Sequence, residues 1–165
     1  LGDDILVETD AGNKIRAWSP HDGRTYWCHG FTFGGSTAEG GPYSIWGYLV
    51  PKVLAEDGWK QVCGGVPYAG IAIFYAPAGR INHSGKSKKG RVVNVRFDEA
   101  TSLLESKPGF DLAPENQLST KSFSHNAQRY GKYKCYLRGI MLRKYQLTAR
   151  CCPMLGINEL GGATE

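Results

Sequence analysis

Cys28 and His83 are the two residues whose types and order best suit covalent chemistry. Cys28 lies in an aromatic segment, YWCHGFTFGG at 26–35, where small residues follow the thiol and leave access to it. His83 comes after the apolar run 71–75 and a turn at Gly79, at the start of the next extended segment. A thiolate is a nucleophile and an imidazole accepts its proton, so the pair predicts a nucleophile and a general base.

A third polar group would orient the imidazole, as in other thiol and serine enzymes. Asn94 and Glu105 both fit in kind and in their place downstream of His83, and the sequence does not separate them. Ser84 directly follows the histidine, where open backbone could meet a substrate.

The surroundings of the thiol contribute the remaining expected site residues. The backbone N–H of Cys28 and the side chain of Tyr26 are candidate donors to an oxyanion. His29 is adjacent to Cys28 but points to a different side of any regular element, so it is the poorer base and is expected to shape the substrate site. For each of these residues an ordinary buried or surface position is the competing interpretation.

The pattern of apolar runs and turns predicts one α+β domain over residues 1–165, with short helices packed on an antiparallel meander. Its expected parts are a hairpin at 4–18, a helix within 43–58, strands at 71–75, from 80, at 91–97, 102–106 and 132–138, a loop at 108–119, a helical turn or two at 122–129 and a mobile tail at 153–165.

Composition excludes several classes of protein. The hydrophobic fraction of 41% and the 4 tryptophans and 9 tyrosines favour a folded core. No apolar run approaches the roughly 18 residues that span a bilayer. The Walker A, GxGxxG, HExxH and zinc-deaminase patterns are absent, so neither a cofactor nor a metal is expected. The 5 cysteines cannot all pair within one chain.

Residues 25–110 resemble the core of papain-like cysteine hydrolases of the NlpC/P60 and CHAP type. The resemblance rests on Cys28-His29-Gly30, the run Ala69 to Tyr75, and His83-Ser84-Gly85. It implies a cysteine that opens a helix, a base histidine that begins a strand, and thiol-dependent hydrolysis of amides in peptidoglycan stem peptides or proteins. Ile71 departs from the family, which usually has an aspartate there, and His29 replaces a residue that is often small.

Two alternatives remain open from the sequence. The same thiol and histidine could deamidate glutamine or transfer an acyl group, as in a secreted or delivered bacterial toxin, for which an immunity or carrier protein would be the partner. The other alternative is a non-enzymatic basic binding module, since the net charge is +5. Nucleic acid is not the expected ligand, because neither of the basic runs 86–91 and 129–144 interleaves aromatic residues over more than a few positions.

Overall fold

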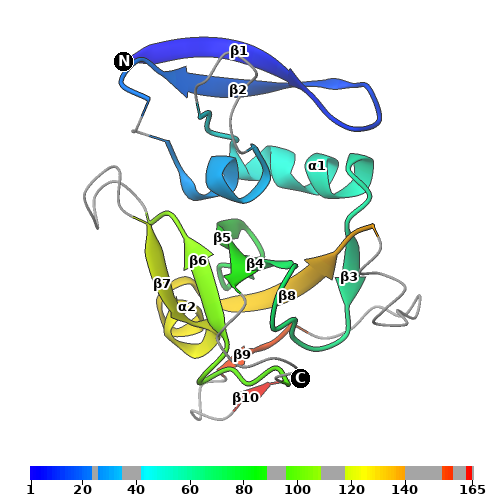
Figure 1. Ribbon diagram of the computed structural model, residues 1–165, viewed down its shortest axis with the longest axis vertical. Coiled ribbons are helices and arrows are strands. Elements are labelled where there is room, and N and C mark those ends of the chain that lie inside the picture. The colour runs from blue at the N-terminus through cyan, green and yellow to red at the C-terminus, as the bar shows by residue number, and fades with distance from the viewer. Residues whose placement is uncertain are drawn as a thin grey trace.

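The chain forms a mixed α+β structure in layers (Figure 1). A hairpin lies at one end, helices lie beneath it, an antiparallel sheet follows, and a further helix covers the other face of the sheet. The computed structural model describes residues 1–23, 26–34, 42–88, 96–108, 118–139, 154–157 and 163–164. Within these ranges no helix is long and apolar enough to span a membrane.

The central sheet confirms most of the predicted strands. In the described residues its order is β3-β8-β4-β5-β6-β7, and every neighbouring pair is antiparallel. The strands are β3 Lys60–Val62, β4 Ile71–Tyr75, β5 Ile81–Lys88, β6 Leu103–Ser106, β7 Ser119–Ser122 and β8 Lys132–Leu137. Strands β4, β5 and β6 follow one another as expected, although β5 pairs directly with β6. Strand β7 was not predicted, and β8 returns from late in the chain to lie between β3 and β4.

Short helices cover both faces of this sheet. They are a helical segment at 28–34, π-helical over Gly30–Gly34, a 3-10 turn Gly47–Leu49, α1 Val50–Glu56 and α2 Phe123–Tyr130. On one face, Val50 and Leu54 of α1 pack on Ile71 and Ile73 of β4. On the opposite face, α2 packs on the side chains of β4 that alternate with Ile71 and Ile73.

The N-terminal hairpin is confirmed and is slightly longer than expected. It consists of β1 Gly2–Glu8 and β2 Lys14–Pro20, paired antiparallel. Ile15 joins Ile45 and Val53 in a small core between the hairpin and α1. The hairpin therefore packs on the helical layer and not on the sheet.

Some predicted segments fall outside the described residues or differ from expectation. Residues 91–95 of the predicted third strand and 109–117 of the predicted loop are not described, and Arg96 and Phe97 are not in a strand. Part of the tail predicted to be mobile is docked, because Leu155 exchanges two backbone hydrogen bonds of 2.7 Å with Tyr133. Short strands follow at β9 Gly156–Ile157 and β10 Ala163–Thr164.

Replacing Phe74 with alanine is expected to lower the free energy of unfolding by about 3–5 kcal/mol, the usual cost of deleting a buried phenylalanine ring. Phe74 is 0% exposed and packs against the rings of His83, Tyr130 and Tyr133. Urea unfolding would measure the change. The matched control is Leu6→Ala on the exposed hairpin, where a loss comparable to that of Phe74→Ala would contradict this account of the core.

Candidate active site

The position of Cys28 is fixed by the residues immediately before it. The N–H of Trp27 donates to Ser44 Oγ at 2.9 Å, and Ser44 is fully buried and bridged to Trp18 by two backbone hydrogen bonds. The carbonyl of Trp27 accepts the Phe31 N–H at 3.2 Å, which begins the helical segment. Cys28 therefore occupies the first turn of a helix, as the sequence predicted.

The Cys28 sulfur lies against the edge of β5. Because the Ser87 N–H donates to Gly70 O on the β4 side at 2.9 Å, alternation along the strand turns the Ser84 N–H away from β4. Pairing with β6 begins at Lys86, so that edge is open at Ser84. The Ser84 N–H lies near the Cys28 sulfur at this point and lowers the pKa of the thiol.

A buried network of hydroxyl groups and an imidazole surrounds the thiol. His29 Nδ1 lies 2.7 Å from Ser84 Oγ, Ser84 Oγ donates to Thr32 Oγ1 at 2.8 Å, and Thr32 donates to the Cys28 carbonyl at 2.9 Å. The Ser84 hydroxyl also lies near the sulfur, where it favours the thiolate form of Cys28. This network joins the first helical turn to β5 and holds the thiol at the strand.

Burial raises the pKa of the Cys28 thiol to about 11. The N–H groups of Ser84, His29 and Cys28 and the Ser84 hydroxyl favour the thiolate, but they offset only part of the desolvation. At neutral pH the resting protein therefore carries a neutral thiol. A base must remove its proton during nucleophilic attack.

His83 is the residue that precedes Ser84 on β5, and its ring projects to the other face of the strand. The ring is 1% exposed and stacks on Tyr130 at a centroid distance of 3.7 Å. Burial lowers the pKa of His83 to about 3, and the nearby His29 and Arg129 lower it further. The ring is therefore neutral near pH 7, and its Nε2 has no hydrogen-bond partner among the described residues.

The structure thus brings together Cys28, His29 and Ser84, whereas the His83 ring lies on the opposite face of β5, against Tyr130 of α2. In this resting geometry no hydrogen bond joins the His83 ring to the sulfur within the described residues. His29 was expected to be the poorer base and to shape the substrate site, and its ring is bonded to Ser84, which also contacts the thiol. The bond between His29 and Ser84 could not be predicted from the sequence, because it forms only where β5 meets the helical segment.

The proposed orienting groups do not meet the His83 ring in the described structure. Glu105 pairs in register with Lys86, which shares a face with Ser84, and its carboxylate contacts the Lys88 ammonium at 3.5 Å. It therefore lies on the face opposite to His83. Asn94 lies outside the described residues.

Tyr26, the expected oxyanion donor, lies beside another element. The Lys107 ammonium sits 4.6 Å from the centre of its ring, and Lys107 itself is only 3% exposed. Burial raises the pKa of the Tyr26 hydroxyl, so this group stays protonated near neutral pH. Its role as a donor stays a prediction.

An aromatic cluster next to the thiol was not foreseen from the sequence. Trp27 stacks on Trp18 with ring centroids 5.9 Å apart and meets Trp46 edge-on at 6.2 Å. These residues come from three separate segments, and only the fold brings them together. All three are partly exposed, so they form an apolar wall near Cys28.

No protein-family model, curated protein or solved structure matches this chain. A function can therefore be inferred only from the geometry of the site. Among the described residues, no three histidine, cysteine or acidic side chains gather in a group able to hold a metal ion.

Proposed function

We propose that the protein is a thiol-dependent amide hydrolase of the papain-like kind, with Cys28 as nucleophile and His83 as general base. The observation that carries the proposal is the place of Cys28, which is in the first turn of a helix with its sulfur near the N–H of Ser84, the residue after His83. A helix that presents a cysteine to an antiparallel sheet, with a histidine on the strand that it meets, is the arrangement expected of that family.

The choice of base follows from the hydrogen bonds of the two imidazoles. His29 already uses its Nδ1 in the bond to Ser84, whereas Nε2 of His83 is unpartnered. A neutral, buried imidazole with an open nitrogen is able to accept a proton. In the resting structure the ring lies on the face of β5 opposite to the Ser84 side chain, so this role requires the His83 side chain to turn toward the Cys28 edge of the strand when substrate binds.

The reaction would proceed in two steps. The thiol transfers its proton to His83 as the sulfur adds to the amide carbonyl, and the imidazolium then protonates the leaving amine. Water hydrolyses the resulting thioester and restores the thiol. The N–H groups of Cys28 and His29, which lie near the sulfur, would be the donors to the developing oxyanion.

The net charge of +5 favours an anionic substrate such as the peptidoglycan of a bacterial wall. Purified wall sacculi incubated with the wild-type protein should release fragments with new amino and carboxyl ends, detected by mass spectrometry. The Cys28→Ala variant should release none. The control is Cys135→Ala, which removes the other free thiol of the described residues, buried in the core away from Cys28.

A protein substrate should be tested beside the sacculi. Cleavage of a polypeptide by the wild type but not by Cys28→Ala also supports the proposal. A gain of about one mass unit at glutamine, without cleavage, would show that the reaction is deamidation of glutamine and not hydrolysis of peptide bonds. If the Cys28→Ala variant is as active as the wild type on either substrate, Cys28 is not the nucleophile.

A further inference from the structure

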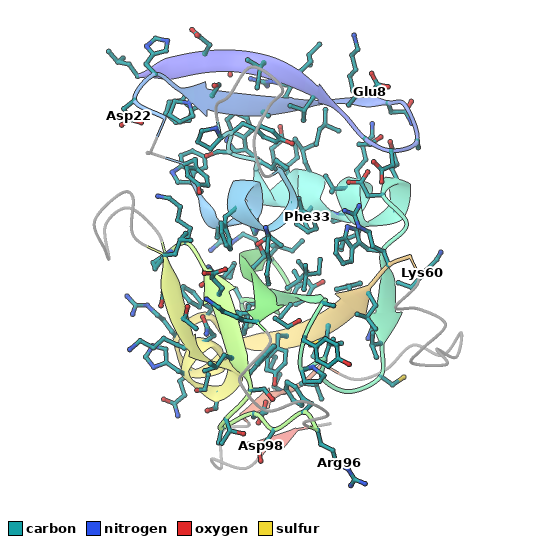
Figure 2. All side chains as sticks on the ribbon, viewed as in Figure 1. Glu8, Asp22, Phe33, Lys60, Arg96 and Asp98 are labelled. Carbon is teal, nitrogen blue, oxygen red and sulfur yellow. The ribbon has the colours of Figure 1, made fainter. Side chains whose placement is uncertain are left out.

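A cavity of about 380 Å³ lies at the far end of the helical segment from Cys28, on the face of the sheet that α1 covers. Its volume is within the range of sites for small molecules. It is lined by Thr32, Phe33, Gly34, Trp59, Ala69, Gly70, Ile71, Lys86, Ser87 and Arg138. Phe33 lies between the helical segment and the sheet (Figure 2) and meets Trp59 edge-on at 6.2 Å, which gives the cavity an aromatic wall.

The charge of the cavity is positive. Lys86 and Arg138 contribute two cations, and no acidic residue is in the lining. The Lys86 ammonium lies 4.6 Å from the ring centre of Phe31 and makes no ion pair with any described residue. Arg138 pairs with Asp10 at 3.3 Å, but both side chains are largely exposed, so this bond contributes little.

The hydroxyl groups of the lining already have partners. Ser87 Oγ accepts the Gly70 N–H at 2.8 Å and donates to the Gly70 carbonyl, and Thr32 donates to the Cys28 carbonyl. The remaining side-chain donors are therefore the two cations and the indole N–H of Trp59, which is buried without a hydrogen-bond partner among the described residues. A ligand that satisfies them needs an anionic acceptor, and the aromatic wall favours an apolar body attached to it.

The backbone at the cavity is also unusual. Ala69 has a φ of 63°, and it is the non-glycine residue with positive φ in the described part of the chain. Such conformations are unfavourable for residues with a Cβ and concentrate at ligand sites and switches. The strain therefore falls on the lining of the same cavity that holds the two cations.

We propose that this cavity binds a small carboxylate with an apolar or aromatic body, held by Lys86 and Arg138 against Phe33 and Trp59. The carboxylate belongs either to a free small molecule or to an acidic peptide. The site is separate from the Cys28 sulfur, and its occupancy does not depend on hydrolysis by the protein.

Isothermal titration at low salt would test the proposal with N-acetylphenylalanine, its uncharged amide and an amidated Ala-Glu-Ala peptide. We expect the acid to bind at least about tenfold more tightly than the amide, because a charge-assisted hydrogen bond is lost in the amide. Added salt should weaken the binding of the acid. Tighter binding of N-acetylphenylalanine supports the free small molecule, and tighter binding of the peptide supports the peptide source.

Variants identify the site. Lys86→Gln and Arg138→Gln should each weaken the binding of the preferred carboxylate by about tenfold or more. Lys60→Gln is the matched control, since Lys60 is exposed on β3, projects outward (Figure 2) and carries the same charge. Equal binding of acid and amide, absence of binding by both carboxylates, or binding unaffected by Lys86→Gln would overturn the proposal.

Discussion

The His83→Gln variant is expected to hydrolyse its substrate roughly a hundredfold to ten-thousandfold more slowly than the wild type, the usual contribution of a positioned general base. The effect is large because burial raises the pKa of the Cys28 thiol to about 11. Few thiolates exist at neutral pH, so attack depends on proton transfer in the transition state. Initial rates on the sacculi or the protein substrate would measure the loss.

Two histidine controls make this result specific. His29→Gln should lose less activity, because its imidazole contacts Ser84 and acts on the thiol only through that hydroxyl. His125→Gln, at an exposed position on α2, should leave the rate unchanged. If His29→Gln abolishes hydrolysis while His83→Gln retains it, His29 is the base and the Ser84 hydroxyl carries the proton.

Measuring how much of the His83→Gln variant is folded separates a catalytic role of His83 from a structural one. The His83 ring stacks on Tyr130 and packs near Phe74, so its replacement also changes the core. Near-ultraviolet circular dichroism would report the packing of these rings. A variant with an unchanged spectrum and the expected loss of rate supports catalysis, whereas lost activity only in proportion to lost folded protein would reduce His83 to a packing residue.

The fold could be predicted wherever the local pattern is strong. The run Ile71–Tyr75 is continuously apolar because its alternate residues enter the cores on the two faces of the sheet, and it was identified to the residue. Pro51 in the first turn and Gly58, whose φ is 75°, marked the limits of α1. The insertion of β8 between β3 and β4 could not be predicted, since strand order depends on contacts far apart in the chain.

The site could be predicted only in part, for the same reason. The residue types identified Cys28, and the order of segments identified His83, because both signals are local. The links from Ser84 to His29 and Thr32 cross 55 and 52 positions, and no spacing rule relates them. Glu105 fitted the orienting role in kind, but the register that pairs it with Lys86 places it on the other face of the sheet.

Acid is expected to destabilise this protein strongly, through two buried neutral histidines. Burial lowers the pKa of His29 to about 4 and that of His83 to about 3. Below pH 6.5 the unfolded chain binds protons at these residues that the folded chain does not, so stability falls as the pH falls. Each contributes about 1.4 kcal/mol per pH unit, or roughly 4 kcal/mol for the pair at pH 5.

Urea unfolding at pH 7 and pH 5, with the disulfide of Cys63 intact, would measure this loss. His83→Gln and His29→Gln should each reduce the dependence on pH by about 1.4 kcal/mol per unit, because a glutamine takes up no proton. His125→Gln is the matched control, because its ring is exposed to water and should leave the slope unchanged. A slope that is the same in all variants would mean that the two imidazoles take up protons within the fold, and the neutral His83 needed as a base would then be excluded at pH 5.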